Sequence, residues 1–97
     1  MRIGVPREIH AGERRVATTP EVAAQLIKLG FEVAIETGAG KESSFSDGAY
    51  QAAGCEVLEA AGDIWQRSDI ILKVRAPEGD ESAVLRSDQT LITYMWP

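Results

Sequence analysis

Residues 18–36 read TTPEVAAQLIKLGFEVAIE, and this stretch decides the class of fold. Thr18 and Glu21 have the spacing of a capping box. Thr19 is suited to be an N-cap, and Pro20 fits the first position of a helix. Apolar residues then recur at helical spacing until a glycine, which typically ends a helix. The remainder alternates in polarity and carries β-branched residues, which predicts a strand after the helix.

The same signals extend this pattern along the chain. Strands are expected at residues 2–5, 31–36, 55–58, 69–74 and 90–95, and helices at residues 20–29, 47–53, 60–67 and 78–86. Strands that alternate with helices predict a parallel sheet with right-handed crossovers. Apolar runs at residues 70–72 and 91–95 are typical of central strands that are covered on both faces.

The expected fold is therefore α/β, with three layers, a mainly parallel β-sheet and Rossmann-like or flavodoxin-like crossovers. The chain of 97 residues is the length of one domain. Its last expected strand stops two residues before Pro97, and no helix follows to cover it. We therefore expect residues 1–97 to be one N-terminal domain of a larger chain that is incomplete at its C-terminal end.

Composition and charge exclude several classes of protein. The net charge of −5 argues against a nucleic-acid-binding domain, whose basic face supplies most of the affinity. No run of about 18 apolar residues is present, as a membrane span would require. The single cysteine, Cys55, excludes an internal disulfide and a cysteine metal site. The first residues do not resemble a signal peptide, so a cytosolic domain is expected.

Arginines are concentrated at the start of this acidic chain. Four of its seven arginines lie within the first fifteen residues: Arg2, Arg7, Arg14 and Arg15. Arg15 follows the first strand, and Lys73 and Arg75 end the fourth on one face, because side chains alternate along a strand. Ligands of open α/β sheets bind beyond the carboxyl ends of the strands, where a guanidinium could hold a carboxylate or phosphate. The alternative is local salt bridges with Asp69 or Glu78.

Other conspicuous residues favour structural roles. Residues 38–41 read GAGK, but Ser43 stands where a dinucleotide fingerprint needs glycine, and the P-loop pattern fails as well, so a turn is expected. His10, the only histidine, is expected at the surface, and Cys55 is expected to be a small buried apolar residue. The two tryptophans, Trp65 and Trp96, are expected in the core or at an interface, and no metal site is predicted.

Four motifs together resemble a known family. They are RIGVPRE at residues 2–8, ERRVATTP at 13–20, ETGAG at 36–40 and LKVRAP at 72–77. Their order, over essentially the whole chain, resembles the N-terminal domain shared by alanine dehydrogenases and the alpha subunit of proton-translocating NAD(P) transhydrogenase.

Two positions, 75 and 96, favour one branch of this family, while position 15 is shared with the other branch. In alanine dehydrogenases the substrate carboxylate is held by an arginine matching Arg15 and by a lysine where this chain has Arg75, and a catalytic histidine matches Trp96. An indole N–H only donates, so Trp96 cannot transfer a proton. The ending Met95-Trp96-Pro97 resembles transhydrogenase alpha subunits. The resemblance therefore implies Arg15 and Arg75 as substrate-binding candidates and assigns no catalytic residue.

The transhydrogenase resemblance implies part of an enzyme that transfers hydride between NADH and NADP⁺ and couples this to proton movement. NAD(H) would be bound mainly by a second domain outside these residues, and NADP(H) by a partner component. The implied partners are the beta subunit, or membrane and NADP-binding components, and a second alpha subunit in a homodimer. The complex would lie at the cytoplasmic face of the inner membrane, with this segment itself soluble and inactive alone.

Two other functions remain open from the residues. One is an alanine dehydrogenase-like NAD-dependent oxidoreductase with a changed active site. The other is a non-catalytic binding or assembly module, in which Arg15 and Arg75 would bind a small carboxylate or a partner protein.

Overall fold

The computed structural model describes residues 1–9, 12, 14–74 and 88–93. Its strands are β1 (Arg2–Val5), β2 (Glu32–Glu36), β3 (Glu56–Leu58), β4 (Ile70–Lys73) and β5 (Thr90–Thr93). Its helices are α1 (Pro20–Lys28), the 3₁₀ helix η1 (Lys41–Ser43), α2 (Asp47–Ala52) and α3 (Ala61–Arg67). Every predicted strand and helix that falls in this part of the chain is confirmed within a few residues, whereas η1 was expected as part of a turn. The helix predicted at residues 78–86 lies outside the described residues.

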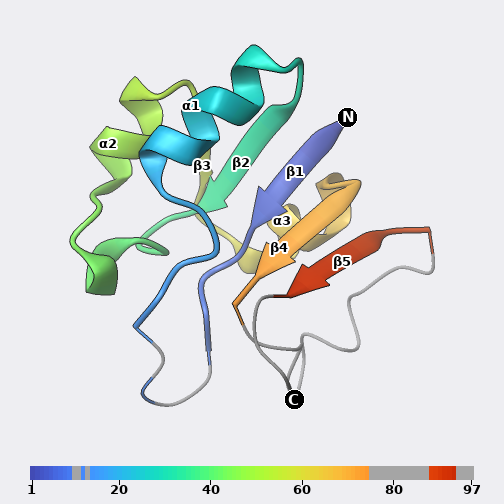
Figure 1. The fold of residues 1–97 in the computed structure, drawn as a ribbon. Helices are drawn as coiled ribbons and strands as arrows, with labels where there is room; N and C mark the ends of the chain where they lie inside the picture. Colours follow the sequence, from blue (N-terminus) through green and yellow to red (C-terminus); the bar gives the residue numbers. More distant parts are fainter. Residues whose placement is uncertain (10–11, 13, 75–87, 94–97) are drawn as a thin grey trace.

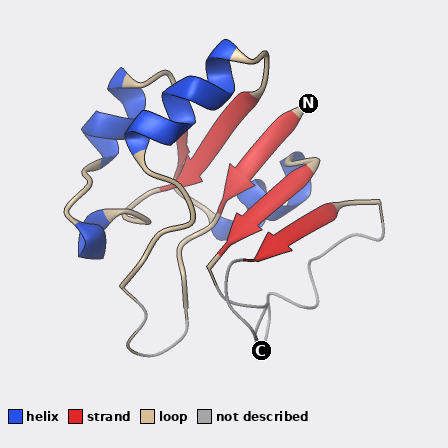
Figure 2. Ribbon diagram, in the orientation of Figure 1, coloured by secondary structure: helices blue, strands red, loops and turns tan. Residues whose placement is uncertain are grey.

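The strands form one parallel sheet in the order β3-β2-β1-β4-β5 (Figure 1). Rossmann-like and flavodoxin-like crossovers were both expected, and this order is the Rossmann-like one. The chain runs outward from β1 through β2 to β3, and then returns to the other side of β1 with β4. Helices α1 and α2 cover one face of the sheet and α3 covers the other (Figure 2). The predicted three-layer α/β architecture is therefore confirmed.

Alternating side chains of the strands build a core on each face of the sheet. The larger cluster, beneath α1 and α2, includes Ile3, Val33, Ile35 and Leu72. The smaller cluster joins strand residues to α3 and consists of Ala34, Ile64, Trp65 and Ile71. Trp65 is 1% exposed, which confirms the expectation of a core tryptophan.

The predicted start of α1 forms, but with one cap rather than two. The Thr19 hydroxyl accepts a hydrogen bond from the N–H of Val22 at 3.2 Å, and Pro20 is the first helical residue. Thr18 does not act as a cap, because its hydroxyl is buried and has no hydrogen-bond partner among the described residues. Ser46 caps α2 in the same way as Thr19 caps α1, accepting from the N–H of Ala49 at 3.1 Å.

The last strand was expected at the centre of the sheet, whereas the described residues place it at an edge. β5 lies at the edge of the described sheet, and Ile92 on it is 42% exposed. The apolar run correctly predicts a strand. Whether both faces of that strand are covered depends on the strands and helices beside it, which the run itself does not reveal. By contrast, the run in β4 does lie inside the sheet, between β1 and β5.

Candidate functional site at the carboxyl ends of the strands

The strand order places a switch point between β1 and β4. β1 leads to β2 on one side, while β4 occupies the other side. Open α/β sheets form a crevice at the carboxyl ends of two such strands, and this is where they bind ligands. We call the segment that follows β1, residues 7–18, the arginine loop, because it carries Arg7, Arg14 and Arg15.

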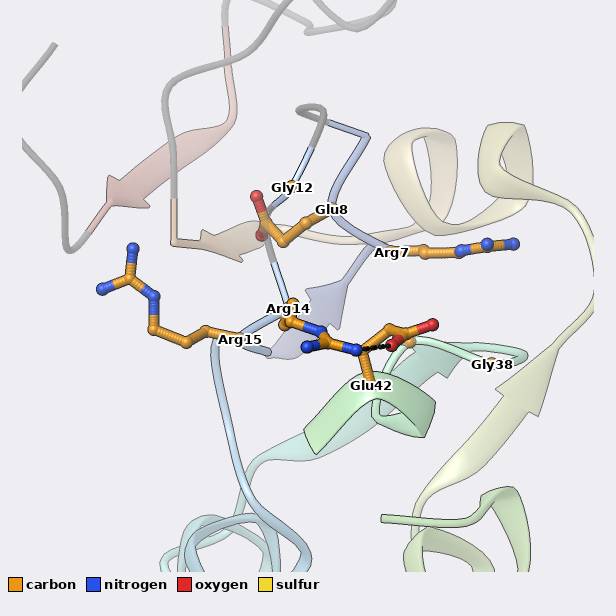
Figure 3. Close-up of a pocket in the computed structure, with 8 residues that line it drawn as sticks. Arg7, Glu8, Gly12, Arg14, Arg15, Gly38 and Glu42 are labelled. Carbon is orange, nitrogen blue, oxygen red and sulfur yellow. Dashed lines mark hydrogen bonds and ion pairs between the residues drawn. The ribbon is translucent and has the colours of Figure 1, made fainter. Parts of the chain in front are cut away.

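The arginine loop and the turn after β2 enclose a pocket of about 330 Å³ (Figure 3). Its described lining residues are Arg7, Glu8, Gly12, Arg14, Arg15, Gly38, Ala39 and Glu42. Arg15, the candidate from the sequence, is exposed and lines this pocket. Arg75, the other candidate, lies outside the described residues, so the structure does not test whether the two come together.

The three arginines of the pocket do not converge on one point. Arg14 pairs with Glu42 at 3.4 Å, and both side chains are largely exposed, at 77% and 57%. Arg7 and Arg15 extend in opposite directions, Arg15 toward the side on which β4 and β5 end (Figure 3).

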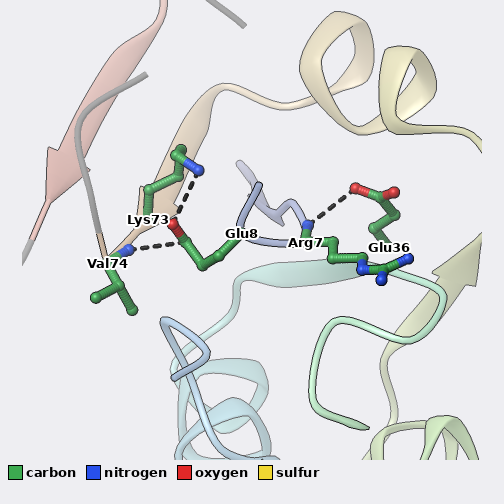
Figure 4. A network of polar contacts seen from close by, with 5 residues as sticks. All are labelled: Arg7, Glu8, Glu36, Lys73 and Val74. Atoms are coloured by element: carbon green, nitrogen blue, oxygen red, sulfur yellow. Dashed lines mark hydrogen bonds and ion pairs between the residues drawn. The ribbon is translucent and has the colours of Figure 1, made fainter. Parts of the chain in front are cut away.

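Glu8 joins the arginine loop to the end of β4 (Figure 4). One carboxylate oxygen lies 3.0 Å from Lys73 Nζ, and the other accepts a hydrogen bond from the N–H of Val74 at 2.9 Å. The side chains of Glu8 and Lys73 are 3% and 1% exposed. Lys73 thus forms a salt bridge, as the structural alternative expected, here with Glu8. Of the two partners named for that alternative, Asp69 accepts a hydrogen bond from the N–H of Arg2 at 2.8 Å, and Glu78 lies outside the described residues.

The sequence carries signals for this ion pair that did not lead to a prediction. A lysine within an apolar strand such as β4 needs a buried carboxylate as partner, because an unpaired buried charge is very costly. Glu8 follows the first predicted strand by three residues, at the same edge of the predicted parallel sheet as Lys73. The side-by-side position of β1 and β4, however, could not be deduced from the chain order alone.

The glycine-rich turn at residues 38–41 is a structural turn, as predicted. Gly38 has φ of 76°, and its N–H donates to Asp47 at 2.9 Å, while the N–H of Ala39 donates to the carbonyl of Glu36. A Cβ on Gly40 would lie 2.6 Å from a ring carbon of Tyr50. The amides at 38 and 39 are thus engaged within the turn and do not form a phosphate cradle.

Asp47 is the acceptor that holds this turn. Its carboxylate receives hydrogen bonds from the Thr37 hydroxyl and from the N–H of Gly38. The Thr37 hydroxyl contributes most, followed by Gly38, to keeping the pKa of Asp47 below its ordinary value. The ionised carboxylate is therefore the form that this turn stabilises.

The remaining candidates do not add to the site. Cys55 is buried, as predicted, and burial raises the pKa of its thiol, so it lacks the character of a nucleophile. His10 and Trp96 lie outside the described residues. Among the residues that the structure does describe, no cluster of His, Cys, Asp or Glu could hold a metal ion. None of the described helices is long and apolar enough to cross a membrane.

Comparison with known proteins agrees with this fold and this order of motifs. The family described as "Alanine dehydrogenase/PNT, N-terminal domain" matches residues 4–97. NAD(P) transhydrogenase subunit alpha from Cereibacter sphaeroides is 56% identical over 97 residues, which are all of this chain and 18% of that protein. Alanine dehydrogenase from Mycolicibacterium smegmatis is 42% identical over 95 residues, which cover 98% of this chain and 26% of that enzyme.

A solved structure described as transhydrogenase from Sinorhizobium meliloti superimposes with a TM-score of 0.90. The two sequences are 35% identical, and the match covers 98% of this chain and 27% of that chain. The chain therefore belongs to the alanine dehydrogenase/transhydrogenase N-terminal domain family. It spans about a fifth to a quarter of the length of the relatives that it matches, and these relatives are oxidoreductases.

Proposed function

We propose that this chain is the N-terminal domain of the NAD(H)-binding alpha subunit of a proton-translocating NAD(P)⁺ transhydrogenase. The single observation that carries the proposal is the 56% identity to a transhydrogenase alpha subunit over the whole chain. Identity to an alanine dehydrogenase is lower, at 42%. The tryptophan at position 96, where alanine dehydrogenases resembling this chain carry a histidine, favours the same branch.

The described residues fit a wall of a cofactor cleft better than a cofactor cradle. In the glycine-rich turn at residues 38–41, the amides of Gly38 and Ala39 are bound within the turn. A Rossmann-type pyrophosphate site needs free amides at the start of a helix directly after a strand. In this proposal NAD(H) is held mainly by residues beyond the chain, and NADP(H) by a partner component.

The proposal also covers the partners of the whole protein and its location in the cell. The alpha subunit would act with a beta subunit, or with membrane and NADP-binding components, and as a homodimer, at the cytoplasmic face of the inner membrane. Arg15 and Arg75 would contact an anionic group of the substrate at the carboxyl ends of the strands. No residue of this domain transfers hydride in this proposal, because hydride transfer belongs to the cofactors, and the protein supplies orientation and exclusion of water.

The first experiment separates the two enzyme classes of the family. The full-length protein, assembled with its membrane and NADP-binding components in vesicles, is assayed for hydride transfer between NADH and NADP⁺ and for reduction of NAD⁺ by L-alanine. We expect transhydrogenation and no alanine-dependent formation of NADH. Alanine-dependent formation of NADH without NADP⁺ would instead identify the alanine dehydrogenase-like alternative, which the retained arginine at position 15 favours.

The second experiment tests Arg15. Arg15→Ala in the full-length protein is expected to lower kcat/KM for hydride transfer at least tenfold, because a guanidinium can hold an anion with two hydrogen bonds. Arg14→Ala is the matched control, since Arg14 is a neighbouring exposed arginine that pairs with Glu42. An Arg15→Ala enzyme that folds and turns over like the Arg14→Ala enzyme would exclude Arg15 from the binding site.

A further inference from the structure

Residues 7 and 8 are bound to both strands that flank β1. The N–H of Arg7 donates to a carboxylate oxygen of Glu36, at the end of β2, at 2.9 Å. On the other side, the Glu8 carboxylate binds Lys73 and the N–H of Val74, at the end of β4 (Figure 4). The first residues of the arginine loop therefore bridge the carboxyl ends of three neighbouring strands.

The Glu8 carboxylate adds a contact between the residues after β1 and the end of β4, beyond their backbone pairing. The paired residues of β1 and β4 are Ile3 with Ile70 and Gly4 with Ile71, so the register is short. At residue 74 the backbone N–H donates to Glu8 instead of to a carbonyl of a neighbouring strand. Because this occurs at the switch point, Glu8 holds the strands where the sheet leaves a crevice.

The chemistry of this contact favours fixed geometry over simple stabilisation. Replacing a buried ion pair by apolar residues of similar volume is often neutral or stabilising, so stability alone does not explain Glu8 and Lys73. A carboxylate with one oxygen on an ammonium and the other on a backbone N–H has its position and orientation both defined. The contact thereby fixes the start of the arginine loop relative to β4.

Two neutral hydrogen bonds to backbone carbonyls, besides the exposed Arg14–Glu42 pair, hold the later part of the same loop. The Ser43 hydroxyl donates to the carbonyl of Arg14 at 2.7 Å, and the Tyr50 hydroxyl donates to the carbonyl of Thr18 at 2.7 Å. Arg15 lies between these two points, and Glu8 supplies a buried charged contact on the β1 side. The location of Arg15 therefore depends on tethers at both ends of the loop.

We propose that Glu8 is a positioning residue, whose contact with Lys73 and the N–H of Val74 holds the arginine loop over the carboxyl ends of the strands and so places Arg15. The effect on substrate rests on the proposed function of Arg15. The effect on the loop does not, and it can be measured separately.

Trypsin cleavage of the folded full-length protein measures the loop directly, because the loop carries the arginines that trypsin recognises. In Glu8→Gln we expect cleavage after Arg14 and Arg15 to become at least fivefold faster than in the wild type. Cleavage after Lys28, the last residue of α1, reports opening of the domain as a whole and should change less than twofold. Glu56→Gln is the matched control, since it removes a carboxylate that pairs with Arg2 on the opposite edge, and it should leave loop cleavage unchanged.

Three results would overturn the positioning role. One is wild-type cleavage at Arg14 and Arg15 in Glu8→Gln, and another is an equal increase at Lys28, which would make the ion pair a general stabiliser. If Glu8→Gln does not fold, Glu8→Leu combined with Lys73→Met leaves no buried charge and is judged by the same cleavage rates. Failure of this double variant to fold as well would make the pair a condition of folding and would also reject the proposal.

Activity measurements separate this inference from the proposed function. If Glu8 acts through Arg15, Glu8→Gln lowers kcat/KM for hydride transfer in the wild type but has no further effect in Arg15→Ala. If Arg15→Ala is fully active, the proposed binding role of Arg15 fails, while the cleavage rates still decide whether Glu8 positions the loop. Independent losses in Glu8→Gln and Arg15→Ala, multiplying in the double variant, would contradict action through Arg15.

Discussion

Two ion pairs attach to opposite ends of β1, and they differ in burial. At the amino end, Arg2 pairs with Glu56 of β3, and the two side chains are 19% and 49% exposed. Beyond the carboxyl end, Glu8 pairs with Lys73 of β4, and these side chains are 3% and 1% exposed. The same type of interaction is thus partly exposed at one end of the strand and buried inside the protein at the other.

The difference shows which end of β1 has a contact whose loss would be energetically costly. An exposed pair is screened by solvent and contributes little, whereas loss of one partner from a buried pair leaves a charge without compensation. The buried pair lies at the switch point where this class of sheet binds ligands. The exposed pair lies at the opposite, amino end of β1, where Arg2 and Glu56 both line a small pocket and bind each other.

The largest expected effect comes from breaking the buried pair. Lys73→Met leaves the Glu8 carboxylate buried without its ammonium partner and should lower the opening free energy of the domain by about 3–5 kcal/mol. Hydrogen exchange of β1 and β4 amides under native conditions, in the full-length protein, measures that free energy. Lys41→Met, at an exposed lysine of η1, is the control and should change it by less than about 0.5 kcal/mol. A loss below about 1 kcal/mol for Lys73→Met would show that water screens the pair.

The middle of β1 gives the next largest effect. A Cβ on Gly4 would lie 2.0 Å from the Ser68 hydroxyl oxygen and 3.0 Å from a methyl of Ile64, so α3 and its end pack directly on the backbone of β1. Gly4→Ala should therefore cost about 1–3 kcal/mol by the same exchange measurement. It would loosen β1, which carries Arg2 and leads directly to Glu8, and so test the two ends of the strand together.

Gly62→Ala is the matched control for this substitution. Gly62 lies in α3, and a Cβ there meets nothing within 4 Å. Alanine should stabilise the helix by about 0.5–1 kcal/mol, because it has the higher helix propensity. Destabilisation of similar size by both variants would contradict the packing explanation for Gly4.

The contacts at β1 also show which features could be predicted from the sequence and which could not. Periodicity and capping residues predicted the elements and the parallel sheet, because these signals are local to each segment. The position of β4 beside β1 arises from crossovers, so the pairing of Glu8 with Lys73 was not predicted. The edge position of β5 was missed for the same reason. Arg15 was predicted at the correct edge of the sheet, but its direction away from Arg7 depends on the path of the whole loop.

A neutral tether tests whether charge is what distinguishes the buried pair. Tyr50→Phe removes the hydrogen bond to the carbonyl of Thr18 and should cost about 1 kcal/mol, much less than Lys73→Met. Native-state hydrogen exchange on both variants gives the two values side by side. A loss for Tyr50→Phe as large as that for Lys73→Met would mean that burial of the contact, and not its charge, decides the cost.

Tyr50 also gives a pH dependence of known sign. Burial, with a smaller contribution from Cys55, raises the pKa of Tyr50 from its ordinary value of 10.0 to about 12. The folded state therefore binds the phenolic proton more tightly than the unfolded state does. Stability from this group is complete below pH 10.0 and is lost as the pH rises toward about 12. Tyr50→Phe should lack this decline, and an identical decline in both proteins would assign it to other groups.

The smallest effect is expected at the exposed pair, and its dependence on salt completes the comparison. Arg2→Met should cost no more than about 1 kcal/mol, because Glu56 is half exposed and is solvated when it loses its partner. The Arg2 Nε is buried without a hydrogen-bond partner among the described residues, so its removal also relieves an unfavourable group and offsets part of the loss.

Raising the ionic strength from about 0.1 to 1 M shortens the Debye length from about 10 to 3 Å, which should remove most of the difference between Arg2→Met and wild type. The buried Glu8–Lys73 pair has no solvent between its charges, so the cost of Lys73→Met should persist at the higher salt concentration. If salt reduced both costs in the same proportion, the two pairs would differ in location but not in physical character.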